Sequence, residues 1–322
     1  MDERGLMKNT YKKIGFYLLA LGLAATAAQF LLVMILTMCG ISETQLQEGG
    51  WMMWLATFVP MYCIAMPLFV LLMKKIPAEE GIQTRMKVKE VILFFFICLP
   101  VMYCGNLVGN LLSVMLSGSD VVNPLDAYVM ENSIPKILII VIIGPLMEEW
   151  IFRKQIIDRC VQYGKKKAVL LSAIAFSLFH MNMFQLFYAF GLGLIFAYVY
   201  VRTRKLIYPV ILHMMVNFMG GAVAPWVMGK IDMDALMAFS ESGGTAVLSE
   251  DLIAGAMLLL AYSLVLLTCS IIGFVLLVIK ASRSQFLKTK EVWYGKETYG
   301  NAGMVCYMIF CIIIAGASLF MA

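Results

Sequence analysis

Long apolar runs separated by short polar connections are the main pattern along this chain. A helix needs about 20 apolar residues to cross a bilayer, and the runs here are close to that length. The pattern predicts nine candidate transmembrane helices, over residues 14–39, 51–73, 91–115, 136–152, 168–184, 186–201, 206–228, 252–279 and 303–321. The fifth and sixth runs are so close together that they could form one hairpin. The predicted fold is therefore all-α, a polytopic transmembrane helical bundle of eight or nine spans.

The composition strengthens this interpretation. Hydrophobic residues make up 62% of the 322 residues, charged residues make up 14%, and the mean hydropathy is +0.87. A soluble domain would contain about 25% charged residues. We therefore expect an integral membrane protein with no sizeable soluble domain, so that any chemistry takes place in the membrane.

The connections between the runs differ in charge. Of the 25 Lys and Arg residues, 23 lie in 1–13, 74–90, 153–167, 202–205 and 280–302. The other connections contain only Lys136 and Lys230, together with several acidic residues. Because cytoplasmic connections carry an excess of Lys and Arg, this alternation predicts a multi-pass protein with a cytoplasmic N-terminus.

Few ionisable residues lie within the runs. Glu148 and Glu149 come late in the fourth run, and the only two histidines, His180 and His213, lie in the fifth and seventh. An acidic residue at the centre of a spanning helix costs about 2.5–3.5 kcal/mol on insertion scales, so such residues are functional candidates. Each has a structural alternative when taken alone. The glutamates could form an interfacial cluster with Arg153, and a buried His could make one interhelical hydrogen bond.

The expected depths of these residues favour one shared site. At 1.5 Å per residue, Glu148 lies roughly 12 Å from the cytoplasmic face and His180 roughly 18 Å. His213 lies roughly 10 Å from that face, and Asn217 is one turn deeper. Three runs that alternate in direction thus bring polar residues to a similar layer of the membrane, which unrelated polar groups would not be expected to do.

Helical spacing divides the roles of the two glutamates. They lie about 100° apart around a helix, so they cannot face the same point equally. Arg153 follows Glu149 by four residues, the spacing that favours an ion pair. We expect Glu149 and Arg153 to form a supporting pair and Glu148 to face the histidines. The preceding Gly144-Pro145 removes a backbone donor, which predicts a kink and a free carbonyl beside a water-lined cavity.

The same spacing places the other candidates on common faces. His213 and Asn217 are four residues apart, so they share a helix face and can act on one oxyanion. Phe176 is one turn before His180 and is expected to form a wall of the same cavity.

A carboxylate, two imidazoles and a carboxamide around buried water suit amide hydrolysis. Glu148 can take a proton from water and pass it to the leaving amine. His180 would position that water. His213 and Asn217 could donate to the oxyanion, where one donor is worth about 2.7–4 kcal/mol.

A zinc ion is the alternative means of activating the water. Glu148, His180 and His213 are a plausible zinc-ligand set with a position left for water. No H-E-x-x-H motif is present, so the usual soluble zinc-peptidase signature is absent. Physical reasoning from the residues leaves metal-activated and carboxylate-activated water both open. The sequence also lacks the G-x-S-x-G of a serine nucleophile and the G-x-G-D of an intramembrane aspartyl site.

Three short motifs resemble those of a known family. The sequence contains E-E-x-x-x-R from Glu148 to Arg153, F-x-x-x-H from Phe176 to His180, and H-x-x-x-N from His213 to Asn217. In this order they resemble the CAAX-protease and bacteriocin-processing family of intramembrane proteases, also called the Abi family. The resemblance covers about 135–222. It leads us to divide the chain into N-terminal spans (1–134), a catalytic core of four spans (135–228) and C-terminal spans (229–322).

The resemblance implies an intramembrane endopeptidase that cuts a membrane-associated or lipidated protein or peptide. It implies water activation by Glu148 and His180, and an oxyanion site at His213 and Asn217. Members of the family are commonly labelled metalloproteases, and bacterial members are linked to bacteriocin maturation or self-immunity. The expected location is the plasma membrane, and the expected partners are the bilayer and a peptide substrate, not nucleic acid.

Two other classes of function remain as alternatives. One is a non-catalytic immunity or partner-binding membrane protein that uses the same fold. The other is a proton- or cation-coupled transporter, because carboxylates and histidines also form relays. A transporter would be expected to show an internal repeat and paired broken helices, and we find neither pattern in the sequence.

Overall fold

The computed structural model describes residues 2–42, 45–46, 51–118, 123, 134–243 and 249–321, and its regular elements are helices. The N-terminal part contains α1 (Glu3–Met38), α3 (Trp51–Phe58), η1 (Val59–Ala65), α4 (Met66–Met73) and α5 (Val88–Ser117). The C-terminal part contains α14 (Met233–Glu241), α15 (Glu250–Ser282), α16 (Gln285–Lys288), α17 (Gly295–Thr298) and α18 (Ala302–Met321). All-α architecture, predicted from the apolar runs, is confirmed.

The central part of the chain carries the predicted site. One continuous helical segment contains α7 (Ile134–Lys136), η2 (Ile137–Ile143), α8 (Gly144–Glu149), η3 (Trp150–Ile157), α9 (Asp158–Cys160) and η4 (Val161–Tyr163). It is followed by α10 (Lys165–Phe179), α11 (Met183–Thr203), α12 (Ile207–Phe218), η5 (Met219–Val223) and α13 (Ala224–Met228). The segments η1, η2, η3 and η5 are π-helical, and η4 is a 3₁₀ turn.

Most of the predicted spans agree with these helices to within a few residues, but α1 begins at Glu3 instead of residue 14, and the helical segment that contains the fourth span continues to Tyr163 instead of ending at residue 152. Among the described residues, seven helices are long and apolar enough to cross a membrane, in the ranges 3–38, 54–73, 88–117, 183–203, 207–228, 250–282 and 302–320. The fourth and fifth predicted spans are also helical, but the segment 134–163 and the 15-residue α10 are not among these seven. The polytopic helical bundle is confirmed, while the number of crossings and the three-part division of the chain stay predictions.

One predicted boundary is wrong. The fifth run was expected to continue to residue 184, but α10 ends at Phe179 and α11 begins at Met183. The chain turns here because Met181 adopts a left-handed conformation, with φ of 48°. Asn182 then caps α11 by accepting a hydrogen bond from the backbone N–H of Phe184. The predicted hairpin of these two helices is confirmed, and they pack against each other along their length.

Prolines explain three of the π-helical segments. Pro67, Pro145 and Pro225 are each the second residue of the α-helix that follows η1, η2 or η5. A proline ring clashes with the carbonyl of the residue four positions earlier. Widening the preceding turn to the i→i−5 pattern of a π-helix relieves that clash. The kink predicted at Gly144-Pro145 therefore takes the form of a widened helix.

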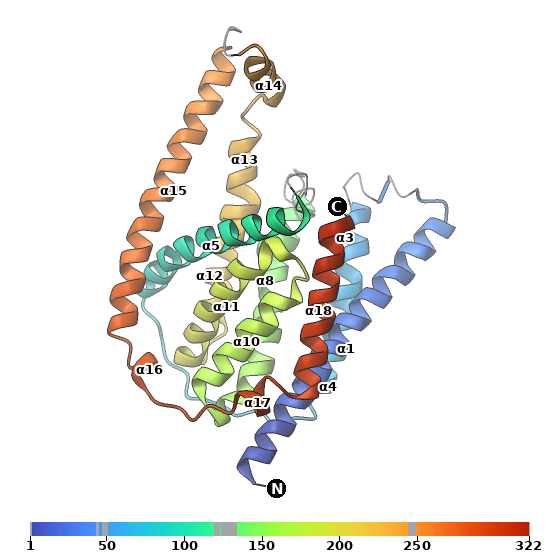
Figure 1. The fold of residues 1–322 in the computed structure, drawn as a ribbon, viewed down its shortest axis with the longest axis vertical. Helices are drawn as coiled ribbons and strands as arrows, with labels where there is room; N and C mark the ends of the chain where they lie inside the picture. The colour runs from blue at the N-terminus through green and yellow to red at the C-terminus, as the bar shows by residue number, and fades with distance from the viewer. Residues whose placement is uncertain are drawn as a thin grey trace.

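The bundle is held by close contacts between long helices. In Figure 1, α5 runs across the bundle, and it packs against α11 on one side and α15 on the other. Gly105 and Gly109 of α5 lie directly against the α11 backbone at Tyr188 and Phe184. Small residues permit this approach, which is typical of helix packing in membranes. The helices α13, α14 and α15 extend beyond the rest of the bundle in the same view.

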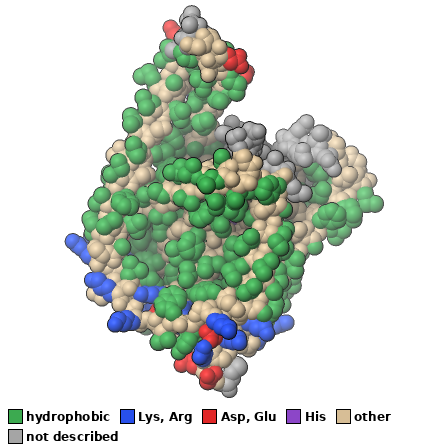
Figure 2. Space-filling view, viewed as in Figure 1, with side chains coloured by type: hydrophobic (Ala, Val, Ile, Leu, Met, Phe, Trp, Pro, Cys, Tyr) green, Lys and Arg blue, Asp and Glu red, His purple; other side chains and the backbone are tan. Residues whose placement is uncertain are grey.

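The surface is divided by charge in the way the sequence predicts. Figure 2 shows hydrophobic side chains over the flanks of the molecule, and Lys and Arg gathered at the end that carries the N-terminus. Acidic side chains appear among these basic ones and also at the opposite end, on the tip near α14, where the picture shows no Lys or Arg. This distribution supports an integral multi-pass membrane protein. The cytoplasmic location of the N-terminus stays a prediction.

The contact between α1 and α18 gives a test of the fold. A Cβ added at Gly15 would overlap the backbone of Gly303, and one added at Gly303 would overlap the backbone of Lys12. We expect Gly15→Ala to destabilise the protein by about 1–3 kcal/mol, because neither backbone can move aside. Thermal unfolding in detergent would measure this.

The matched control is Gly316→Ala on α18, where no atom lies within 4 Å of the added methyl group. We expect this control to keep the wild-type unfolding temperature or raise it slightly, since Ala favours a helix over Gly. Equal unfolding temperatures for the two variants would contradict the packing of α1 on α18.

Candidate active site

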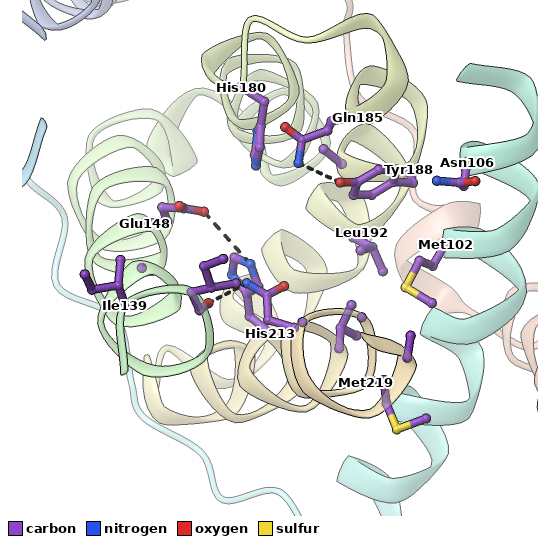
Figure 3. Close-up of a pocket in the computed structure, with 18 of the residues that line it drawn as sticks. Met102, Asn106, Ile139, Glu148, His180, Gln185, Tyr188, Leu192, His213 and Met219 are labelled. Carbon is purple, nitrogen blue, oxygen red and sulfur yellow. Dashed lines mark hydrogen bonds and ion pairs between the residues drawn. The ribbon is translucent and has the colours of Figure 1, made fainter. Parts of the chain in front are cut away.

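A cavity of about 600 Å³ brings most of the predicted residues together. The helical elements that line it are α3, η1, α5, η2, α8, α10, α11, α12, η5, α13 and α15. Among the predicted site residues, those that line it are Glu148, Phe176, His180, His213 and Asn217. In Figure 3, Glu148, His180 and His213 approach the cavity from three different helices. The prediction that separate helices bring their polar residues to one place is confirmed.

Glu149 lies behind the cavity, in a fully buried ion pair. Its carboxylate accepts hydrogen bonds from Nε of Arg153 at 2.8 Å and Nη2 at 3.2 Å, and both side chains are 0% exposed. Arg153 also donates to Ser172 Oγ at 2.7 Å and lies over the ring of Phe176 at 4.7 Å. The hydrogen-bond partners of the Arg153 guanidinium are thus buried side chains that the fold holds in place. The predicted ion pair between Glu149 and Arg153 is confirmed.

The same carboxylate orients His213. Nδ1 of His213 lies 3.0 Å from Oε1 of Glu149, and the imidazole stacks on Phe196 with ring centres 5.2 Å apart. A carboxylate can only accept, so Nδ1 must carry a proton. In a neutral His213 the other nitrogen, Nε2, is therefore proton-free.

His180 is oriented in a similar way at the end of α10. Its Nδ1 lies 2.8 Å from the carbonyl oxygen of Phe176, so this nitrogen also donates. Edge contacts with the rings of Phe176 and Phe179 fix the plane of the imidazole. The left-handed turn at Met181 begins immediately after it. The neutral forms of both histidines thus offer a proton-free Nε2, which can accept a hydrogen bond from water.

Glu148 lies at the cavity wall instead of behind it. Its side chain is 14% exposed, and Oε2 is 3.9 Å from Nε2 of His213 (Figure 3). Oε1 accepts a longer hydrogen bond of 3.4 Å from the hydroxyl of Tyr62. Glu148 was predicted to face the histidines, and it lies beside Nε2 of His213 as expected. The carboxylate closer to His213 is nevertheless that of Glu149, 3.0 Å from Nδ1, a contact that the sequence did not predict.

Asn217 connects α12 to the widened helix. Gly144 N–H bonds to the carbonyl of Ile139, so the i→i−5 pattern would next pair Pro145 with Ile140. Proline has no N–H, and the carbonyl of Ile140 instead accepts a hydrogen bond of 2.9 Å from Nδ2 of Asn217. The free carbonyl predicted beside Pro145 is confirmed, and Asn217 is its partner. Nδ2 retains a second hydrogen for another acceptor.

The sequence interpretation missed some residues of the site. Tyr62 belongs to an apolar run outside the three motifs, and Ser172 lies outside them on α10. Gln185 and Tyr188 also line the cavity and are joined by a 2.7 Å hydrogen bond (Figure 3). Proline at two positions near Tyr62 was a weak sign of irregular helix geometry there, and no sequence pattern identified the others.

The predicted zinc ligands do not form a ligand set as placed. The described residues contain no group of three or more His, Cys, Asp or Glu side chains arranged to hold a metal ion. The proton-free Nε2 atoms of His180 and His213 are chemically suited to a metal. Zinc therefore stays a prediction.

Stability measurements can test the buried pair. Removing one member of a buried pair leaves an unpaired buried charge, which costs about 3–5 kcal/mol. We expect Arg153→Ala to lose about this amount in the free energy of unfolding, measured by denaturation in detergent. Arg202→Ala is the matched control, since Arg202 pairs with Glu90 at 2.6 Å with its side chain 37% exposed. Partly exposed pairs contribute about 0–1 kcal/mol, so similar losses for both variants would contradict the structural role of Arg153.

Comparison with known proteins shows that this chain is similar to membrane proteases. Residues 130–219 match the family model described as Type II CAAX prenyl endopeptidase Rce1-like. The chain is 27% identical over 169 residues to the membrane-embedded CAAX protease MroQ of Staphylococcus aureus (strain USA300), covering 49% of this chain and 68% of the relative. It is 33% identical over 90 residues to the putative membrane peptidase YdiL of Bacillus subtilis (strain 168), covering 27% of this chain and 36% of the relative. No solved structure matches the chain at a significant level.

Proposed function

From the premise that this chain is a membrane peptidase of the CAAX-protease and bacteriocin-processing family, we propose that it is an intramembrane endopeptidase. Its substrate is a peptide bond of a membrane-associated or lipidated protein or peptide. The observation that carries the proposal is the wall of one cavity, where the carboxylate of Glu148 lies beside two imidazoles whose Nε2 atoms are free of protons.

The reaction begins with a water molecule beside Glu148. Glu148 accepts one proton of this water, and Nε2 of His180 accepts a hydrogen bond from the other. The water oxygen attacks the carbonyl carbon of the peptide bond and forms a tetrahedral intermediate. The proton held by Glu148 then passes to the leaving nitrogen as the C–N bond breaks. The products are a carboxylic acid and an amine.

His213 and Asn217 stabilise the oxyanion of that intermediate. Asn217 has a second hydrogen on Nδ2 beyond the one given to Ile140. His213 can donate from Nε2 only in its protonated form, which takes its extra proton from solvent before the reaction begins, so that the proton held by Glu148 remains for the leaving nitrogen. The buried carboxylate of Glu149 is the counter-charge for the resulting imidazolium. A positioned donor of this kind is worth about 2.7–4 kcal/mol in the transition state.

The surroundings of the cavity support a membrane-associated substrate. Three of the helices that line the cavity, α5, α11 and α12, belong to segments that are long and apolar enough to cross a bilayer. The side chains around the reactive groups include Met102, Leu192 and Met219 (Figure 3). An apolar cavity of this kind suits a peptide that enters from the bilayer or its surface. The relative in Staphylococcus aureus is named as a membrane-embedded CAAX protease, which also favours such a substrate.

Cleavage of a panel of lipidated and unlipidated peptides by the protein in detergent tests the proposal. We expect Glu148→Gln to lower kcat by about 10²–10⁴-fold, because the amide cannot accept the proton of water. His180→Ala should also lower kcat strongly. The matched control is Glu80→Gln, which alters an exposed glutamate away from the cavity and should cleave like wild type.

The results of this assay distinguish the proposed peptidase activity from the non-catalytic alternative. Normal cleavage by Glu148→Gln would overturn the assignment of the base. If no variant cleaves any peptide and Glu148→Gln still protects cells as well as wild type does, the non-catalytic immunity alternative would be favoured.

A chelator distinguishes the two ways of activating water. We expect wild-type cleavage to persist in a strong chelator, because the placed side chains supply no three-ligand centre. Loss of cleavage that Zn²⁺ restores would instead favour the zinc site at Glu148, His180 and His213.

A further inference from the structure

Tyr62 is the hydrogen-bond donor to Glu148 that lies outside the matched family region. Its hydroxyl donates to Oε1 of Glu148 at 3.4 Å. It comes from η1, which is 86 residues away in the sequence and precedes the range 130–219. The two oxygens of Glu148 therefore face different partners, Tyr62 on one side and Nε2 of His213 on the other.

The fold fixes the position of this hydroxyl. Tyr62 lies in the widened helix before Pro67, and its ring contacts Phe58 with centres 4.7 Å apart. On the opposite side, the Tyr62 hydroxyl lies close to Gly144, where an added Cβ would be 3.2 Å from it. Glycine at position 144 thus leaves the space that the hydroxyl needs to reach Glu148.

We propose that Tyr62 is a positioning residue of the hydrolytic site, whose hydroxyl holds Oε1 of Glu148 so that Oε2 faces His213 and the attacking water. This inference rests on the proposed function. A carboxylate without such a partner can rotate about its terminal bond, which is a broad torsion. The hydrogen bond removes that freedom without contacting the reacting peptide. Catalytic hydrogen bonds are often long in unliganded structures and shorten in the complex, so the 3.4 Å separation is compatible with this role.

The test compares two variants that each lose one tyrosine hydroxyl. Tyr62→Phe keeps the ring and removes the donor to Glu148. Tyr163→Phe is the control, because its hydroxyl bonds to Thr10 at 3.1 Å, outside the cavity. We expect Tyr62→Phe to lower kcat about 10-fold or more, as for the loss of one charge-assisted hydrogen bond, with little change in KM. Tyr163→Phe should keep the wild-type kcat.

An infrared difference spectrum provides a readout that does not depend on turnover. The spectrum of wild type minus Glu148→Gln isolates the carboxyl bands of Glu148. We expect these bands to shift in the Tyr62→Phe background and to stay unchanged in the Tyr163→Phe background. A purely structural role of Tyr62 would not move them.

A second variant reaches the same contact from the opposite side. Gly144→Ala places a methyl group 3.2 Å from the Tyr62 hydroxyl and 3.0 Å from the carbonyl oxygen of Ile139. We expect it to lower kcat also. If its effect passes through the hydroxyl, the double variant with Tyr62→Phe loses less than the two single losses combined.

The outcomes separate this inference from the proposed function. Cleavage that depends on Glu148 but is unchanged in Tyr62→Phe, with unshifted carboxyl bands, would overturn the positioning role alone. Cleavage that does not depend on Glu148 would overturn the proposed function and this inference together. A fall in kcat with shifted bands supports the positioning role.

Discussion

The buried pair of Glu149 and Arg153 is the interaction on which the rest of the site depends. Two charges inside a membrane protein need each other and further hydrogen bonds to offset the loss of water. Here the pair recruits partners from two other helices, Ser172 on α10 and His213 on α12. These contacts fix three helices relative to one another. The same contacts set the proton of His213 on Nδ1, so a structural ion pair also determines the chemistry available at Nε2.

The prolines contribute a second constraint, on the shape of the helix that carries both glutamates. A regular α-helix through Pro145 would set the ring against the carbonyl four residues earlier. The widened turn in η2 avoids this and leaves the carbonyl of Ile140 for Asn217. The same device before Pro67 lies in the helix that carries Tyr62. Irregular backbone thus occurs where polar side chains meet. In membrane proteins such backbone is tolerated only where it is buried against other protein groups or lines a cavity.

Much of this architecture follows from local sequence rules. The apolar runs predict the helices, and the four-residue spacing predicts the pair of Glu149 with Arg153, which is a property of any helix. The spacing of His213 and Asn217 likewise predicts a common face. The end of α10 was placed wrongly because Met181, Met183 and Phe184 prolong the apolar run beyond Phe179. Its left-handed backbone conformation leaves no mark in the hydrophobic pattern.

Contacts between distant segments were not predictable in the same way. Tyr62 is one aromatic residue in an apolar run, and only the packing of η1 beside α8 brings its hydroxyl to Glu148. The proton positions on His180 and His213 also depend on acceptors that tertiary packing supplies, namely a backbone carbonyl and a carboxylate from another helix. A sequence therefore identifies which residues carry the chemistry more readily than which atoms of those residues are free to act.

The separation of the two glutamates explains how one helix serves both stability and reactivity. Glu149 is fully buried, and its charge is balanced by Arg153, so it can hold the bundle without reacting. Glu148 is partly exposed to the cavity, and no Lys or Arg lies among the described residues that line that cavity. The Glu148 carboxylate thus has no Arg or Lys partner of the kind that Glu149 has, which is consistent with the role proposed for it. A regular helix turns adjacent residues by about 100°, and that rotation is sufficient to place one carboxylate in the core and its neighbour at the cavity wall.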